Sequence, residues 1–188
     1  MRLLAPLALV ALAGISVEDV GSNWSAVFLH AERGVPTATA GVGLSVLLAV
    51  QFVGRLAGDR FIDAVGHRRA MVVSLVLVLV GLVEFAWAPT AGLSVVGLAV
   101  AGLGCAITVP LAFSSADALP GLPPHAGVTW INAFMRVTTL LLTPTIGTVA
   151  TLFSLPVTVS AAGVTALVAL LLQLRGAVRD SCARALRR

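Results

Sequence analysis

Long apolar runs, separated by short polar or turn-forming segments, are the main pattern of this sequence. Six runs are each near the ~20 residues that a helix needs to cross the hydrocarbon core of a bilayer. Gly34, Pro36, Pro89 and Pro156 lie between runs, where they end helices or supply the backbone angles of a turn. The pattern predicts an all-α polytopic membrane protein with six transmembrane helices, at residues 3–29, 38–57, 69–88, 91–118, 126–152 and 155–174.

Composition agrees with a chain whose solvent is lipid. The hydrophobic fraction is 59%, the charged fraction is 11% and the mean hydropathy is +1.04. A soluble core of this length could not hide so much apolar surface, so we expect a lipid bilayer around it. The positive charge is all arginine and most of it lies near span ends, which does not predict a nucleic-acid partner. Cys105 and Cys182 show no disulfide or metal-ligand spacing, so we expect neither a metal nor a cofactor.

The arginines also predict an orientation, because Lys and Arg resist translocation. With the N-terminus inside, the outer side holds only Arg33, and both termini are cytoplasmic. Residues 1–175 then form the bundle and residues 176–188 a basic cytoplasmic tail. The inner side holds Arg2, Arg55, Arg60, Arg68, Arg69, Arg175, Arg179, Arg184, Arg187 and Arg188.

The start of the chain also imitates a secretory signal, but its apolar character resumes at Val27, so we interpret it as a span.

The stretch at residues 54–69, here called the signature stretch, joins the second and third spans. It is short and rich in arginine, which predicts a cytoplasmic loop. Its spacing resembles the signature loop of the major facilitator superfamily of secondary transporters, in the expanded form G-R-L-x-G-D-R-x-x-D-x-x-G-x-R-R. A positive-inside loop alone would explain the arginines, but not the spacing of Gly and Asp. The matching residues are Gly54, Arg55, Leu56, Gly58, Asp59, Arg60, Asp63, Gly66, Arg68 and Arg69.

Charged side chains inside spans are costly and must face a cavity, a partner or the interface. Glu84 and Asp117 lie near span ends, where they can reach headgroups, whereas Glu18, Asp19 and Arg136 lie deeper. Helical spacing places Glu18, Ser22 and Ser25 on one face. The residues expected to line a substrate or proton path are Glu18, Asp19, Ser22, Asn23, Trp24, Ser25 and Arg136.

Residues 18–29 resemble E-G-x-x-x-D-W-S-A-V-Y-L, a pattern at the seventh helix in one bacterial branch of the same superfamily. Asp19 stands where the branch has Gly, and Asn23 where it has Asp. The resemblance extends over nearly the whole chain and corresponds to helices seven to twelve of a twelve-helix transporter. It implies one of the two six-helix bundles between which the substrate path runs.

The resemblance implies a secondary transporter, or its C-terminal half, that moves a small solute across the bacterial cytoplasmic (inner) membrane by alternating access. Glu18 or Asp19 would carry a proton, or alternatively would be a structural partner for Arg136. Asp59 or Asp63 would pair with nearby arginines as a cytoplasmic latch. The expected partners are the bilayer, a small-molecule substrate, and a second six-helix bundle or a homodimer. The alternative function is a non-transporting assembly partner or a truncated transporter remnant.

Two further patterns concern packing and chemistry. Small residues recur every four residues on the second span (Gly41, Ser45, Ala49) and on the fourth (Gly97, Ala101, Cys105), which predicts two close helix contacts. Pro110 and Pro144 are expected to bend their helices. No H-E-x-x-H or G-x-S-x-G motif occurs, so we do not expect an enzyme.

Overall fold

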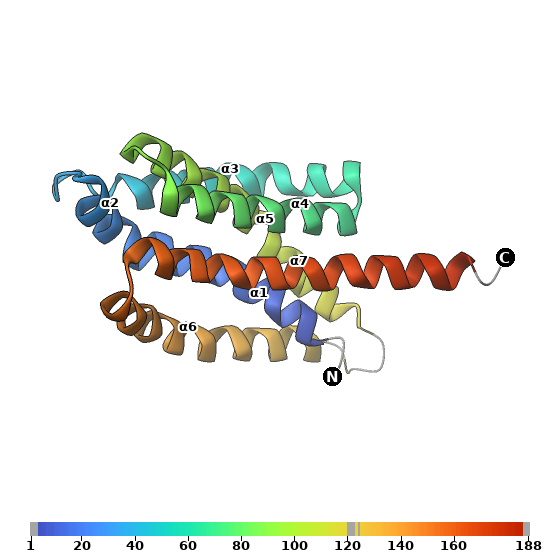
Figure 1. Cartoon of the computed structure of the whole chain (residues 1–188). Helices are drawn as coiled ribbons and strands as arrows, with labels where there is room; N and C mark the ends of the chain where they lie inside the picture. The colour runs from blue at the N-terminus through green and yellow to red at the C-terminus, as the bar shows by residue number, and fades with distance from the viewer. Residues whose placement is uncertain (1–3, 120–122, 124, 186–188) are drawn as a thin grey trace.

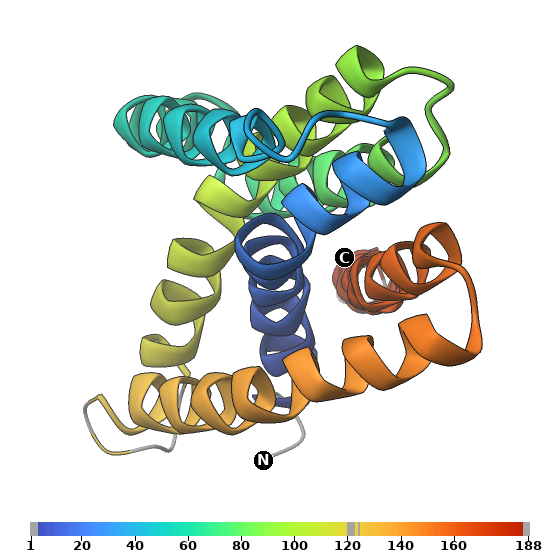
Figure 2. The ribbon, with the colours of Figure 1, turned by 90° about the vertical axis from the view of Figure 1, so that its left-hand side faces the viewer.

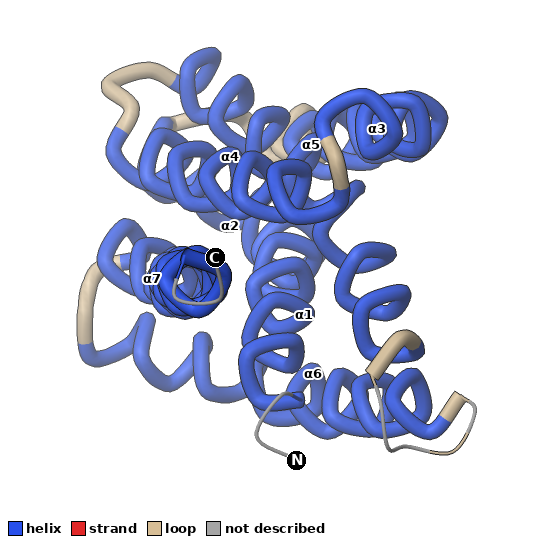
Figure 3. Tube along the Cα trace, turned by 90° about the vertical axis from the view of Figure 1, so that its right-hand side faces the viewer, coloured by secondary structure: helices blue, strands red, loops and turns tan. Residues whose placement is uncertain are grey.

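The computed structural model describes residues 4–119, 123 and 125–185, and these form a bundle of long helices (Figure 1). No strand occurs among the described residues (Figure 3). The elements are α1 (Leu4–Asp19), the π-helical turn η1 (Val20–Trp24), α2 (Ser25–Arg33), α3 (Val42–Val65), α4 (His67–Trp87), α5 (Ala91–Asp117), α6 (Ala126–Leu152) and α7 (Leu155–Ala185).

Among the described residues, six helical segments are long and apolar enough to cross a membrane. The first is made of α1, η1 and α2 together, and the other five are α3, α4, α5, α6 and α7. The predicted fold class, a six-helix membrane bundle, is therefore confirmed. Pro110 lies inside α5 and Pro144 inside α6, and both helices continue past these prolines.

The predicted loop at the signature stretch is wrong. Helix α3 continues through most of it to Val65, and α4 begins at His67, so only Gly66 lies between the two helices. Gly66 has a φ of 85°, which favours glycine and allows the chain to reverse within one residue. The arginine count indicates on which side of the membrane a segment lies, but it says nothing about whether the backbone is helical there.

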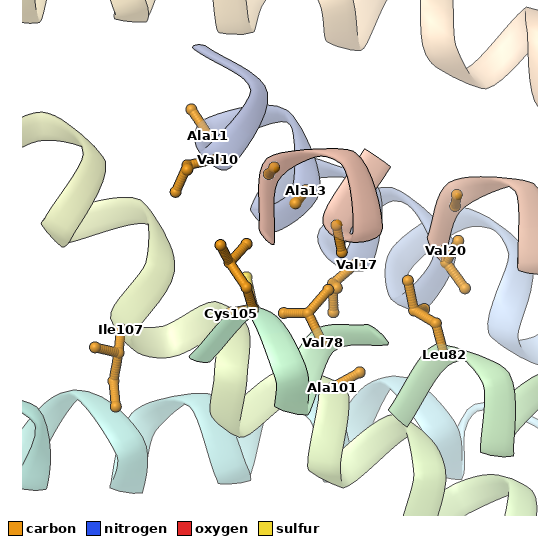
Figure 4. Close-up of a cluster of buried hydrophobic side chains, with 14 of the residues drawn as sticks. Val10, Ala11, Ala13, Val17, Val20, Val78, Leu82, Ala101, Cys105 and Ile107 are labelled. Carbon is orange, nitrogen blue, oxygen red and sulfur yellow. The ribbon is translucent and has the colours of Figure 1, made fainter. Parts of the chain in front are cut away.

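Helix α5 crosses the middle of the bundle and packs against α1, α3, α4 and α6. Its contact with α4 is the most extensive between the described elements, and glycines of the two helices face each other there. A Cβ atom on Gly81 would lie 2.3 Å from the backbone nitrogen of Ala101, and one on Gly97 would lie 2.4 Å from that of Phe85. Cys105 continues this face and is buried with Val78 in the apolar core (Figure 4). The predicted small-residue contact on α5 is thus confirmed.

The predicted small-residue contact on the second span is wrong, since Gly41, Ser45 and Ala49 are exposed. Helix α3 instead turns another face inward, and on this face two glycines let α5 side chains approach. A Cβ atom on Gly54 would lie 2.8 Å from Cβ of Ala106. The inward face of α3 consists of Gly43, Leu47, Gln51, Gly54 and Gly58.

Helix α1 lies between α5, α6 and α7, as the views along the bundle show (Figures 2 and 3). The last helix, α7, extends beyond the rest of the bundle (Figure 1). It runs past residue 175, where we expected the bundle to end, and continues to Ala185. The expected tail is thus a continuation of this helix, and its last three residues lie outside the described residues. Its cytoplasmic location remains a prediction.

Candidate functional site

The first membrane span changes its winding at η1, directly after its two adjacent acidic residues. A π-helical turn adds a residue to the helical repeat, and such turns occur often at functional sites. The expected alignment of Glu18, Ser22 and Ser25 on one face is therefore wrong, because the turn rotates the residues that follow it. Ser22 is exposed, whereas Ser25 is buried and donates a hydrogen bond to the Gly21 carbonyl oxygen at 2.6 Å.

Asp19 is the buried acid of this region, with only 4% of its surface exposed. Its Oδ1 accepts hydrogen bonds from Asn23 Nδ2 at 2.9 Å and from the Thr143 hydroxyl on α6. Its Oδ2 is buried and has no hydrogen-bond partner, and the same holds for Trp24 Nε1. The Trp24 ring lies against Gly147, one helical turn beyond Thr143. The π-turn thus directs an acid and an indole toward the same stretch of α6.

Glu18, the neighbouring acid, has its charged partner on α3. Its Oε1 lies 3.6 Å from the guanidinium of Arg55, and the two side chains are 42% and 58% exposed. Cys105 on α5 closes this cluster: its thiol lies 3.9 Å from Glu18 Oε1 and accepts a hydrogen bond from Gln51 Nε2 at 3.4 Å. Three helices therefore bring a carboxylate, a guanidinium, an amide and a thiol together.

The expected pairing of Glu18 with Arg136 does not form in this structure, because Glu18 contacts Arg55 instead. Both residues nevertheless line one cavity of about 490 Å³ between α1 and α6. Arg136 is exposed to this cavity, and within the described part of the chain it makes no hydrogen bond or ion pair. By helical rise it lies about 15 Å along α6 from Ala126.

The glycines of the signature stretch have structural positions. Gly54 and Gly58 are buried on the face of α3 that packs against α5, and Gly66 forms the turn into α4. The charged residues, apart from Arg55, lie at the exposed end of α3 and the start of α4. These exposed residues are Asp59, Arg60, Asp63, Arg68 and Arg69.

Neither Asp59 nor Asp63 makes an ion pair in the described part of the chain. Contacts between helices at this end of the bundle come from other side chains. Arg68 donates a hydrogen bond to the Gln173 carbonyl oxygen on α7 at 3.2 Å, and a ring nitrogen of His67 lies 2.7 Å from the Ser115 hydroxyl on α5. The latch formed by Asp59 or Asp63 therefore remains a prediction.

No family model matches the chain. The chain is 29% identical to an uncharacterized MFS-type transporter of Yersinia pestis over 135 residues, which cover 72% of the chain and 35% of the relative. It is 28% identical to the membrane protein MosC of Rhizobium meliloti, covering 69% and 32%. It is 29% identical to the uncharacterized transporter y4wD of Sinorhizobium fredii, covering 67% and 33%. The resemblance to the major facilitator superfamily is confirmed.

The chain spans about a third of the length of these curated relatives. The six observed spans agree with the six-helix bundle that the resemblance implies. The polar cluster described above lies on helices of this bundle that are long and apolar enough to cross a membrane.

Sequence reasoning missed three polar groups of the site, namely Gln51, Asn132 and Thr143. Gln51 carries a readable signal, because an amide in the middle of an apolar span is costly unless it has a partner. Thr143 carries none, because threonine is common in spans and can bond to its own helix.

Proposed function

We propose that the chain is one six-helix bundle, equivalent to the C-terminal half, of a secondary active transporter of the bacterial cytoplasmic membrane. It would move a small solute by alternating access against a second bundle. The observation that carries this proposal is the set of exposed charges Glu18, Arg55 and Arg136 on helices that are long and apolar enough to cross a membrane. Charges within a span are too costly to face lipid tails, so the surface that bears them faces water or protein.

Burial along the spans supports a second bundle on this side. In the 18-residue apolar stretch of each span, only 6% of the residues of α6 and 28% of those of α3 are buried, against 61% for α5. These two least buried helices carry Arg136 and Arg55, while Glu18 lies on α1, which contacts α6. A second six-helix bundle, or a second copy of this chain, would cover both helices and enclose the charged surface as a path.

Asp19 is the residue that we expect to carry a coupling proton, in preference to Glu18. Glu18 already has a cationic neighbour, whereas Asp19 is buried and keeps one unpaired oxygen where a proton can reside. The Asp19→Asn variant keeps the Oδ1 acceptor for Thr143 and imitates the protonated acid. We expect it to fold normally and to lose proton-driven accumulation, while exchange of solute across the membrane continues. Proton-driven accumulation by Asp19→Asn at the wild-type level would contradict this role.

The cytoplasmic latch belongs to the same proposal. Asp63 is exposed and has no ion-pair partner in the described part of the chain, so it is available to a second bundle. The double variant Asp63→Asn with Arg68→Ala is expected to lower transport at unchanged abundance in the membrane. If the double variant instead lowers or inverts insertion, the signature stretch is only a topological signal.

The direct test is transport by proteoliposomes that contain this chain alone, or this chain with a six-helix first half. Uptake that requires both parts supports the proposal. The alternative function is a non-transporting assembly partner or a transporter remnant. A stable complex without uptake of any solute would support that alternative and contradict ours.

A further inference from the structure

The cavity between α1 and α6 has the size and lining of a small-molecule site. Its volume of about 490 Å³ lies within the range of ordinary ligand pockets. Most of its lining is apolar, and its polar groups come mainly from α6. The residues that matter for recognition are Ile15, Glu18, Asn132, Met135, Arg136 and Leu140.

Arg136 is the charge in this cavity that has no partner of opposite sign in contact with it. Glu18 also lines the cavity, but its carboxylate lies beside Arg55. Arg136 makes no hydrogen bond or ion pair in the part of the chain that the structure describes. A positive charge without a partner is therefore located on the α6 wall of the cavity.

The donors on that wall converge. Asn132 and Arg136 are four residues apart on α6, so they lie on the same helical face. The amide of Asn132 has no hydrogen-bond partner among the described residues. A guanidinium binds a carboxylate with two parallel hydrogen bonds, a geometry that a point charge does not offer. Ile15, Met135 and Leu140 provide an apolar surface beside these donors.

Resting on the proposed function, we propose that Arg136 and Asn132 bind the carboxylate of a small organic anion, whose apolar body lies against Ile15, Met135 and Leu140. The anion is a solute rather than a lipid phosphate. Arg136 lies about 15 Å along α6 from its start, near the middle of a hydrocarbon core of about 30 Å. Lipid headgroups remain at the surface of that core.

The test is equilibrium binding to the purified chain in a neutral detergent, measured by isothermal titration calorimetry. The probes are 4-phenylbutyrate, its neutral amide 4-phenylbutanamide and the cation 4-phenylbutylamine, which share one apolar body. Hydrogen bonds to a charged group predict that the carboxylate binds about tenfold or more tighter than the amide. We expect the amine to bind most weakly, because the guanidinium of Arg136 repels a cation.

Two variants assign the preference to one side chain. Arg136→Gln should reduce carboxylate affinity to that of the amide and leave amide affinity unchanged, which also shows that the cavity is intact. Arg175→Gln is the matched control, because it removes the same charge from an exposed position outside the cavity, and it should bind like wild type. Arg136→Lys should recover part of the preference, because it restores the charge without the two-pronged geometry.

Several outcomes would overturn the inference. These are equal binding of carboxylate and amide, binding of no probe, or a carboxylate preference that survives in Arg136→Gln. Displacement of phenylbutyrate from the chain in detergent by added phosphatidylglycerol, but not by added phosphatidylcholine, would assign the site to an anionic lipid headgroup instead. Because binding is measured on this chain alone, these results are separate from the transport test. Failed transport with intact carboxylate binding would contradict only the proposed function.

Discussion

The contact between Glu18 and Arg55 can be tested by a double-mutant cycle, with the variants Glu18→Gln, Arg55→Gln and both together. The structure places the carboxylate and the guanidinium 3.6 Å apart on different helices, so each single variant leaves one charge without its neighbour. The double variant removes both charges. We therefore expect the two single losses in stability to add up to more than the loss in the double variant.

The magnitude follows from distance and exposure. Two unit charges at 3.6 Å attract by about 1.2 kcal/mol in water and by about 4.6 kcal/mol at an effective dielectric constant of 20. The side chains are 42% and 58% exposed, which places the pair near the water limit. We expect a coupling free energy of about 1 kcal/mol, similar to polar contacts measured between membrane helices.

The assay is reversible unfolding in mixed detergent micelles, followed by tryptophan fluorescence. A second cycle between Glu18 and Arg136 is the matched control, because these residues share a cavity without touching. That cycle should be additive within about 0.3–0.5 kcal/mol. An additive Glu18–Arg55 cycle, or stronger coupling of Glu18 to Arg136 than to Arg55, would refute the contact.

Two further predictions concern the core and the orientation. Gly81→Ala places a Cβ atom 2.3 Å from the backbone of Ala101, where no flexible group can yield, and should destabilise by about 1–3 kcal/mol in the same unfolding assay. Gly92→Ala on α5 meets nothing within 4 Å and should change stability little, so equal losses in both variants would contradict the close α4–α5 contact. The arginine asymmetry predicts a cytoplasmic C-terminus, so a membrane-impermeant thiol reagent should label Cys182 only in permeabilised cells. Labelling in intact cells would reverse the orientation.

The sequence by itself determined the number and approximate limits of the spans. Span prediction succeeds because every backbone polar group in a bilayer must be satisfied within its own helix, so an apolar run of about 20 residues has few alternatives to a helix. The same reasoning located Glu18, Asp19 and Arg136 at depth, since charge in an apolar run is visible without a structure. The spacing of Gly97, Ala101 and Cys105 also predicted a real contact, because small residues mark places where helices can approach.

Only the tertiary structure decided which partners these residues have. The linear sequence does not tell which arginine Glu18 contacts. Its contact with Arg55 exists because glycines on α3 bring that helix against α5, beside α1. The π-turn η1, which follows Glu18 and Asp19, was also invisible in the sequence, and so were their contacts with Arg55 on α3 and Thr143 on α6. Hydropathy reports how deep a residue lies, whereas the direction in which it points depends on helix rotation. That rotation is set by packing between helices that are distant in the sequence.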